Sequence, residues 1–247
     1  MKILAIYSIK GGVGKTTAAV NLAYLAASEG MRVLVWDLDP QGAASFYFRV
    51  KSRVKGGSKS LVRGKRAIDT LVKGTDYENL DLLPADFSYR HMDLHFDSTR
   101  KPTRQIRRLL KPLKRQYDIV FLDCPPSISL VSENVFAAAD ALLVPLIPTT
   151  LSLRTLDQLM RLRRKNGLEE ITVLPFFSMA DRRKKLHRQI MESVLGKMPD
   201  VLHAFVPYLS AVEQMGTRRA PLGAFVPRGN RALAAYTALW AEIRERI

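Results

Sequence analysis

A glycine-rich segment near the start of the chain has the composition of a phosphate-binding loop. It reads Lys10-Gly11-Gly12-Val13-Gly14-Lys15-Thr16-Thr17 and follows a short apolar run, Ile3–Tyr7. Glycines let backbone N–H groups turn towards phosphate oxygens, and the start of a following helix adds unpaired donors and a partial positive charge. Lys15 would neutralise the β and γ phosphates, and the Thr16 hydroxyl would bind Mg²⁺. The sequence therefore predicts a nucleotide site whose binding residues are Gly11, Gly12, Val13, Gly14, Lys15, Thr16 and Thr17.

Two other apolar runs end in acidic residues. The run Arg32–Trp36 is followed by Asp37 and Asp39, and the run Ile119–Leu122 is followed by Asp123. Ligands of α/β proteins bind at the carboxyl edge of the sheet, so carboxylates at the ends of buried strands are candidates for functional roles. Taken alone, the step from Asp39 into a proline is also compatible with a plain turn.

Short β-branched and apolar runs alternate with longer helical patterns along the whole chain. Several runs lack polar alternation, which indicates strands buried on both faces. This alternation predicts an α/β fold: a single three-layer domain over residues 1–247, with a mostly parallel twisted sheet and helices on both faces. The glycine-rich segment makes the expected type a P-loop NTPase. The predicted strands are Ile3–Tyr7, Arg32–Trp36, Leu80–Leu83, Ile119–Leu122, Ala141–Leu146, Ile171–Phe177 and Ala204–Val206, and the clearest helices are Thr17–Ser28 and Thr155–Lys165.

The charge balance points to a polyanionic partner. The chain has 39 Lys and Arg against 23 Asp and Glu, a formal net charge of +16. Nucleic acid is the first candidate and an acidic membrane the second. A single cysteine, Cys124, excludes an intramolecular disulfide and a cysteine-based metal site within one chain. The apolar run Met1–Tyr7 is too short for a signal peptide, and Val135–Ile147 is interrupted by charge and proline, so no transmembrane helix is expected.

Two stretches carry many cations and no acidic residue. Arg49–Arg66 contains a Gly-Gly-Ser sequence and is predicted to be a mobile basic loop. Arg100–Arg115 is predicted to be a surface helix with a basic outer side, because its apolar residues fall on one face. Those apolar residues are Ile106, Leu109, Leu110 and Leu113.

The phosphate loop departs from the standard pattern in a way that suggests a family. The first glycine of the usual motif would fall at Ile9, and a second lysine, Lys10, is present instead. This segment resembles the deviant Walker A motif of the ParA/MinD ATPases. The resemblance implies that Lys10 reaches the partner's phosphates across an ATP-sandwich homodimer, as an arginine finger does. The alternative for Lys10 is an ordinary solvated lysine.

The acidic strand ends are also similar to motifs of that family. The resemblance implies that Asp39 orients or activates the attacking water. It also implies that Asp123 ends a Walker B strand and holds the Mg²⁺ shell, with Asp37 in support. The expected catalytic residues are Lys10, Lys15 and Asp39, the expected metal residues are Thr16, Asp37 and Asp123, and the cofactors are ATP and Mg²⁺.

The remaining parts of the chain favour the ParA branch. The final segment Ala232–Ile247 has the spacing of a helix docked on the core and is a poor lipid-binding helix, unlike the membrane tail of MinD. After the run Ile171–Phe177, a helix is expected to start at Asp181. Its basic residues Arg182, Arg183 and Lys185 resemble a family position, near a helix start, that contacts the DNA backbone. The segment Pro207-Tyr208-Leu209-Ser210-Ala211 lacks two arginines that many members carry. Arg218, Arg219 and the basic stretch Arg49–Arg66 are candidates to compensate.

Together these features predict a cytoplasmic, nucleoid-associated ATPase without stable membrane binding. It would form an ATP-dependent homodimer, bind DNA without sequence preference and hydrolyse ATP slowly until a ParB-like or adaptor protein stimulates it. The cargo would be a plasmid, a chromosome region or a protein organelle such as the carboxysome. The alternatives are a metabolic ATP-dependent enzyme of the same fold and a MinD-like membrane-associated regulator.

Overall fold

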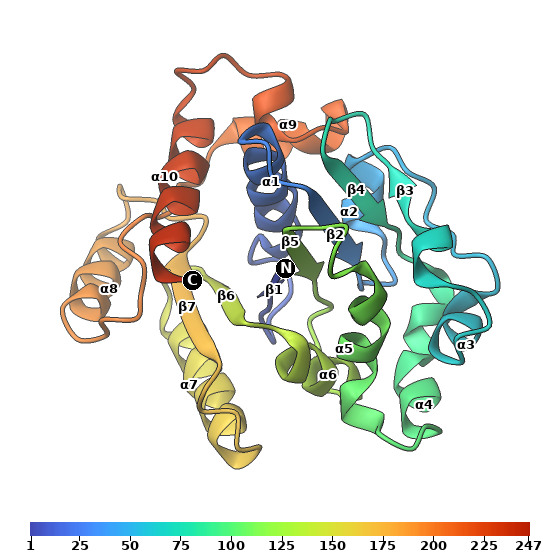
Figure 1. Ribbon diagram of the computed structural model, residues 1–247. Helices are drawn as coiled ribbons and strands as arrows, with labels where there is room; N and C mark the ends of the chain where they lie inside the picture. Colours follow the sequence, from blue (N-terminus) through green and yellow to red (C-terminus); the bar gives the residue numbers. More distant parts are fainter.

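A seven-stranded sheet forms the centre of the molecule in the computed structural model, which describes residues 1–247 (Figure 1). The strand order is β3-β4-β2-β5-β1-β6-β7, and every neighbouring pair is parallel except β3 with β4. The predicted mostly parallel α/β fold is confirmed. The strands are β1 Lys2–Ile6, β2 Val33–Asp37, β3 Lys73–Gly74, β4 Leu80–Leu83, β5 Ile119–Asp123, β6 Ala141–Leu146 and β7 Thr172–Phe177.

Strands β2, β5 and β6 are buried along their full length, as their unbroken apolar sequences indicate. Alternate side chains enter two separate cores. In β1, Ala5 packs into one core, whereas Leu4 and Ile6 pack into the other. The sheet therefore needs a layer of helices on each face.

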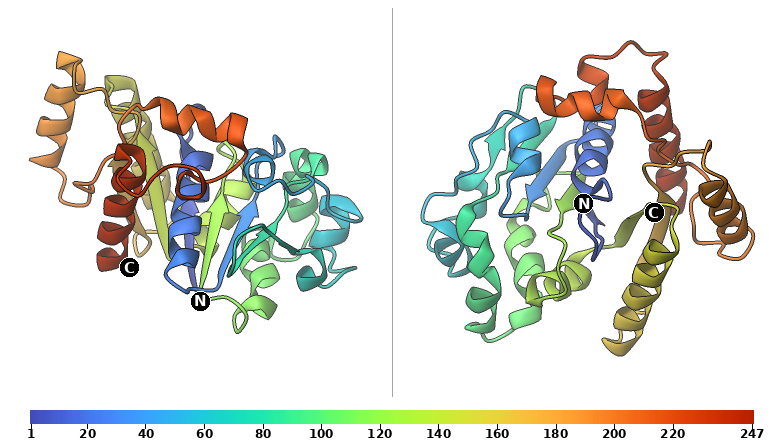
Figure 2. Two further views of the ribbon diagram at one scale, coloured as in Figure 1. Left: turned by 90° about the horizontal axis from the view of Figure 1, so that it is seen from above. Right: turned by 180° about the vertical axis from the view of Figure 1, so that it is seen from behind.

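Helices α1, α2, α9 and α10 cover one face, and α3 to α8 cover the other (Figure 2). The final helix packs against α1 and buries Tyr236, Leu239, Trp240 and Ile243, so the prediction of a docked terminal helix is confirmed. No helix has the length and apolar character needed to cross a membrane. The α-helices are α1 Lys15–Ser28, α2 Ala43–Tyr47, α3 Gly57–Val62, α4 Met92–Asp97, α5 Gln105–Leu110, α6 Leu130–Ala138, α7 Thr150–Lys165, α8 Lys185–Leu195, α9 Ser210–Arg218 and α10 Arg231–Arg246; short 3₁₀ turns are η1 Ile68–Leu71, η2 Phe87–His91, η3 Pro102–Arg104, η4 Lys111–Leu113 and η5 Leu222–Ala224.

One predicted strand is wrong. The segment Ala204–Val206 runs beside β7, and its Val206 N–H donates to the Phe177 carbonyl at 2.8 Å. The β-bridge here is an isolated one, between Ala180 and Pro207 just beyond each segment. The backbone N–H groups of His203 and Ala204 donate instead to the Glu242 carboxylate, at 2.9 and 2.7 Å. These bonds tie the segment to α10, and a continuous ladder with β7 does not form.

Both basic stretches also differ from expectation. Arg49–Arg66 is not simply a loop, because it contains helix α3, whose Leu61 and Val62 are buried. Arg100–Arg115 is not one helix but three short pieces, η3, α5 and η4. Pro102 and Pro112 lie in the first turns of η3 and η4, where proline is tolerated, but proline cannot sit inside a long helix. The predicted apolar face is nevertheless buried, from Ile106 to Leu113.

Candidate nucleotide site and basic groove

The glycine-rich segment forms a tight turn between β1 and α1. Gly12 and Gly14 have positive φ values of 71° and 89°, which glycine adopts without strain. A Cβ atom on Gly14 would lie 2.8 Å from the Ser178 hydroxyl, so a larger residue would displace that side chain in addition to straining the backbone. Helix α1 starts at Lys15, so its first N–H groups point into the turn.

Lys15 is nearly enclosed, with 7% of its surface exposed. Its Nζ donates to the Lys10 carbonyl oxygen at 3.2 Å. Burial lowers the pKa of the Lys15 ammonium, while the nearby Asp123, Cys124 and Asp39 act in the opposite direction. A cation that is costly to bury is therefore placed where several anionic groups converge.

Two carboxylates lie side by side beneath the turn. Asp37 and Asp123 occupy paired positions at the ends of β2 and β5, and both are fully buried. The Asp37 Oδ2 accepts hydrogen bonds from the backbone N–H and the hydroxyl of Ser45, each at 2.8 Å. The Asp37 Oδ1 and both carboxylate oxygens of Asp123 have no hydrogen-bond partner. Unpartnered buried anions are costly, which indicates that this edge binds a cation.

Burial also shifts the pKa values of both Asp37 and Asp123. Burial raises the pKa of Asp37 to about 6, and the Ser45 hydrogen bonds oppose this rise. The pKa of Asp123 is raised well above its usual value, first by burial and then by the neighbouring Asp37, while the Thr16 side chain offsets part of the rise. Asp39 lies above them, half-buried, with its Oδ1 accepting from the Gln41 N–H at 3.0 Å.

Sequence reasoning did not identify a small hollow of about 250 Å³ beside the glycines. Gly12, Gly14 and Thr17 form one side of it, and Met179 and Tyr208 contribute from the other. Met179 adopts a positive φ of 54°, which is unusual for a bulky residue and is found most often near functional sites. The Tyr208 hydroxyl donates to the Glu213 carboxylate at 2.6 Å. The hollow could accept a planar group attached to a phosphate chain held by the turn.

The likeness to known proteins agrees with this geometry. A family model described as an AAA domain matches residues 1–168. The chain is 31% identical to the sporulation initiation inhibitor protein Soj of Bacillus subtilis, over 98% of each chain. It is 34% identical to the chromosome partitioning protein ParA of Caulobacter vibrioides, over 84% of this chain and 80% of that protein. The chain belongs to the ParA branch of the ParA/MinD family of ATPases.

Solved structures give the same fold for this ParA-family chain. A plasmid partition protein from Borrelia burgdorferi superposes with a TM-score of 0.82 at 22% identity, over 100% of this chain and 99% of that one. At this level of identity the likeness concerns the fold alone. The resemblance inferred from the Lys10–Thr17 segment is confirmed by the relatives that match over nearly the whole chain.

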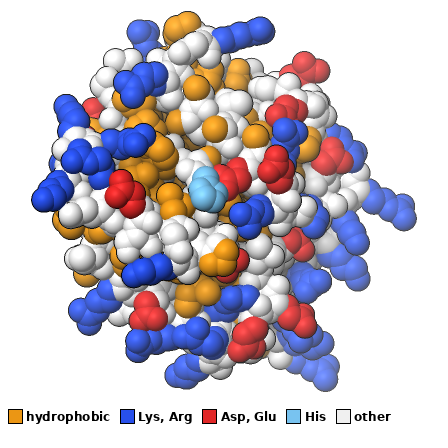
Figure 3. Space-filling view, turned by 90° about the vertical axis from the view of Figure 1, so that its left-hand side faces the viewer, with side chains coloured by type: hydrophobic (Ala, Val, Ile, Leu, Met, Phe, Trp, Pro, Cys, Tyr) orange, Lys and Arg blue, Asp and Glu red, His pale blue; other side chains and the backbone are white.

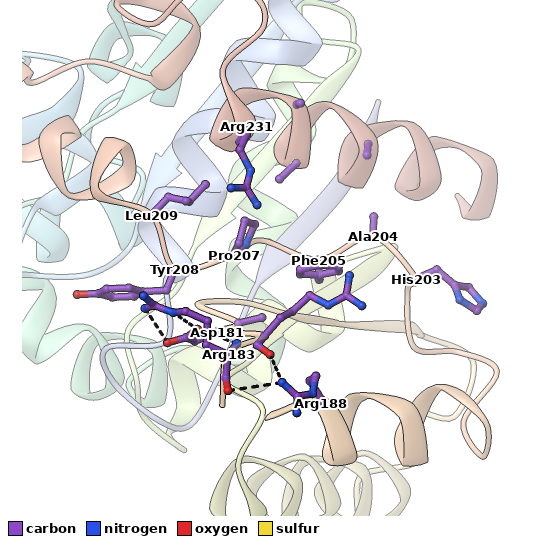
Figure 4. Close-up of a pocket in the computed structure, with 15 residues that line it drawn as sticks. Asp181, Arg183, Arg188, His203, Ala204, Phe205, Pro207, Tyr208, Leu209 and Arg231 are labelled. Carbon is purple, nitrogen blue, oxygen red and sulfur yellow. Dashed lines mark hydrogen bonds and ion pairs between the residues drawn. The ribbon is translucent and has the colours of Figure 1, made fainter. Parts of the chain in front are cut away.

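A second feature of the ParA-family chain is a basic groove between the start of α8 and helix α10. Its volume is about 960 Å³, and Phe205 and several alanines form its apolar lining (Figure 4). Lys and Arg side chains surround hydrophobic ones on this side of the molecule (Figure 3). The cations of the groove are Arg182, Arg183, Arg188 and Arg231.

The residues predicted to contact DNA lie mostly in the turn before α8 rather than in the helix. The structure corrects the expected helix start from Asp181 to Lys185. The Asp181 carboxylate accepts from the Arg183 backbone N–H, and the Asp181 N–H donates to Nδ1 of His187 at 3.1 Å. These bonds hold residues 181–184 in a turn. Arg182 and Arg183 line the groove, whereas Lys185 is exposed at the first position of α8 outside the groove lining.

The other arginines that line the basic groove differ from those expected. The Arg219 guanidinium stacks on the Phe46 ring and donates to the Phe46 carbonyl. Arg49 donates to the backbone carbonyls of Arg218 and Arg219. Neither Arg218 nor Arg219 lines the groove. Arg231, at the start of α10, enters it instead (Figure 4). No sequence signal marks Arg231, because it lies 43 positions after Arg188 and only the docking of α10 brings the two together.

Proposed function

We propose that this chain binds ATP and Mg²⁺ and uses slow ATP hydrolysis to control dimerisation and DNA binding during partition or positioning of a cargo. The observation that carries the proposal is the convergence of Lys15 with Asp123, whose two buried carboxylate oxygens have no hydrogen-bond partner, at the carboxyl edge of the sheet. Asp37 lies beside Asp123 in the sheet and has one unpartnered oxygen of its own. A bound Mg²⁺ and phosphate chain together would compensate these charges.

The residues fit a nucleotide-bound magnesium ion better than a protein-only metal site. No group of three or more His, Cys, Asp or Glu is arranged to hold a metal by itself. Mg²⁺ usually keeps several waters and binds one or two carboxylates together with substrate phosphates. Thr16 and Asp123 would hold the ion, with Asp37 beside them, and the ion would neutralise charge developing on the phosphates.

Asp39 is the group that we assign to the attacking water. One of its oxygens is held by the Gln41 N–H, which orients the carboxylate while its half-buried position leaves it open to solvent. Lys10 lies at the entrance of the turn, with its backbone N–H bonded to the Ser8 hydroxyl at 3.3 Å. We assign its side chain to the phosphates of a second copy, so that closure of the dimer completes each site.

The DNA surface of the proposed dimer is the basic groove and its rim. Arg183 is 88% exposed and holds Asp181 through two side-chain bonds, each 3.0 Å. A guanidinium has five donors, so Arg183 can retain Asp181 and still contact a phosphate. With Arg182 and Lys185 it would bind the backbone without reading sequence. A ParB-like or adaptor protein would then stimulate hydrolysis and release.

The test measures how much ATP increases the affinity of the chain for DNA at near-physiological salt. Duplex DNA of mixed sequence should bind much more tightly to the chain with ATP and Mg²⁺ than with ADP, and sedimentation should show a dimer under the same conditions. An affinity and a mass that do not change between ATP and ADP would contradict the switch. A nucleotide-dependent enzyme of metabolism would show neither change.

A further inference from the structure

A second concentration of positive charge lies outside the nucleotide site and the basic groove. The two acid-free stretches, Arg49–Arg66 and Arg100–Arg115, hold sixteen Lys and Arg. The rest of the chain has 23 Lys and Arg and 23 Asp and Glu. The whole net charge of +16 therefore resides in these two segments, which lie more than thirty positions apart in the sequence.

The fold brings the two segments together. The Arg108 guanidinium donates to the Val62 carbonyl at the end of α3. A hollow of about 500 Å³ forms at this junction, with no acidic residue in its lining. Its four cations come from both segments: Arg63 from the first, and Arg100, Lys101 and Arg108 from the second.

A second hollow of about 520 Å³, lined in part by the same first segment, has the same character. Arg53, Lys55, Arg66 and Lys73 line it, again without an acidic residue. None of the eight cations in the two hollows forms an ion pair with a carboxylate. We call these two hollows together the α3–α5 basic face.

Hydrogen bonds that are largely shielded from solvent hold the backbone of this face in place. The Ser58 backbone N–H and hydroxyl bond the Ser88 hydroxyl and carbonyl at 2.7 and 2.8 Å, and the Val54 N–H donates to Asp86 at 2.8 Å. The buried Asn134 caps the start of α5 by accepting from Gln105 N–H at 2.6 Å and donating to the Pro102 carbonyl at 2.7 Å. The cations therefore extend from a packed framework, which reduces the entropy lost when they bind a ligand.

The positive charge of this face also acts on a neighbouring imidazole. His95 on α4 has its pKa lowered first by burial and then by Lys59, His91 and Arg63. Two of these three neighbours belong to the first acid-free segment. Because charge accumulates here without compensation, an anionic ligand gains from every cation it approaches.

The α3–α5 basic face and the basic groove lie beyond opposite edges of the sheet. Helix α8 follows β7 at one edge, and α3 precedes β3 and β4 at the other. Figures 1 and 2 show these helices on opposite sides of the molecule in every view. A ligand in one region is therefore separated from the other by the width of the sheet.

We propose that the α3–α5 basic face is a second nucleic-acid surface, which binds the phosphodiester backbone of duplex DNA and does not require ATP. Two hollows with four cations each, both built partly from the first acid-free segment, suit a ligand with repeated phosphates better than a single free anion. Protein interfaces have apolar and aromatic centres, whereas the hollows contain only Val62, Val54 and Leu71 as apolar lining. All the cations belong to one chain, so a monomer can use them, and the inference stands apart from the proposed ATP switch.

The test uses nucleotide-free protein at about 50 mM salt, with labelled duplex DNA of mixed sequence. The triple variant Arg63→Glu/Arg100→Glu/Lys101→Glu changes three exposed side chains that make no hydrogen bond or ion pair within the chain. We expect affinity to fall at least about tenfold and the slope of log K against log[salt] to become shallower by about 3, at about 0.9 per lost phosphate contact. The corresponding triple change to Gln should also weaken DNA binding, with a smaller loss of affinity than the change to Glu.

The matched control is Arg154→Glu/Arg164→Glu/Lys165→Glu on α7, which changes net charge equally at exposed positions. Thermal unfolding should be alike in all variants. The proposal is overturned if both triple variants lose affinity equally, or if nucleotide-free protein does not bind DNA. It is also overturned if poly-glutamate of equal charge competes as well as duplex DNA, since the face would then fit an acidic protein. If ATP fails to increase DNA affinity while nucleotide-free binding is intact and sensitive to the triple change, the proposed ATP switch is contradicted and this surface is supported.

Discussion

Asp37 and Asp123 are directly paired across the parallel strands β2 and β5, both fully buried and both with an oxygen that no donor satisfies. Burial raises the pKa of both carboxyl groups, and the neighbouring Asp37 adds to the rise at Asp123. The pair is unfavourable for the isolated chain and suited to a cation. This relationship makes stability without nucleotide depend on pH.

The first prediction concerns that dependence. A folded-state pKa above the unfolded value means that the folded chain keeps protons which the unfolded chain has released. The contribution of Asp37 to stability is therefore fully present below about pH 4 and is lost as pH rises through about 6. Asp123 shifts in the same direction. Asp123→Asn should raise the free energy of unfolding of nucleotide-free protein at pH 7 by about 1–3 kcal/mol.

Thermal unfolding at pH 4 and pH 7, with and without Mg·ATP, checks this prediction. The variant should lose the stabilisation that Mg·ATP confers on the wild type. Asp97→Asn, at an exposed carboxylate, is the control and should change little. A less stable Asp123→Asn protein at pH 7 would mean that the carboxylate has a compensating partner.

The second prediction separates the two lysines of the turn. Lys15→Ala should weaken ATP binding by about 10- to 100-fold or more, because the phosphates lose a buried charged donor. Lys10→Ala should leave equilibrium ATP binding by the monomer nearly intact and abolish ATP-dependent dimerisation. Calorimetry and sedimentation with ATP measure the two properties. Dimerisation of Lys10→Ala at wild-type strength would return Lys10 to the role of a solvated lysine.

The third prediction concerns the attacking water. Asp39→Ala should stop hydrolysis while ATP binding and dimerisation persist, because Lys15 and Thr16 hold the nucleotide and metal. The variant should therefore remain on DNA after ATP is added, and its dissociation rate should fall well below that of the wild type. Asp39→Asn keeps the hydrogen bond to Gln41 and shows whether the charge itself is required. Normal phosphate release by Asp39→Ala would assign the water to another group.

The fourth prediction concerns the groove. The triple change Arg182→Glu/Arg183→Glu/Lys185→Glu should reduce ATP-dependent DNA affinity for all sequences alike and make the salt slope shallower by about 3. ATP-driven dimerisation should remain, because these residues lie outside the nucleotide site. Arg231→Glu should act in the same direction, since Arg231 enters the same groove. A sharp preference for one short sequence would contradict binding through the backbone.

The nucleotide site could be predicted from the sequence because its determinants are local. A glycine turn between a strand and a helix needs particular residues at fixed spacing. Strands buried on both faces are indicated by unbroken apolar runs. The strands at Leu80–Leu83 and Ala141–Leu146 agree with prediction to the residue. By contrast, Ala204–Val206 fails as a strand because Glu242, 38 positions away from Ala204, accepts the hydrogen bond of the Ala204 N–H and interrupts a ladder with β7.

The sequence by itself determined the α/β class, the family, the phosphate turn and the acidic strand ends, because short-range geometry and hydrophobic burial specify them. Only the tertiary structure decided which distant cations share a surface. In the folded chain Arg231 lines the groove, Arg219 stacks on Phe46, and Arg63 and Arg100 from the two acid-free segments line one hollow. The physical reason is that cations on the surface have no preferred spacing along the chain. Their neighbours are set by how the helices beneath them pack on the sheet.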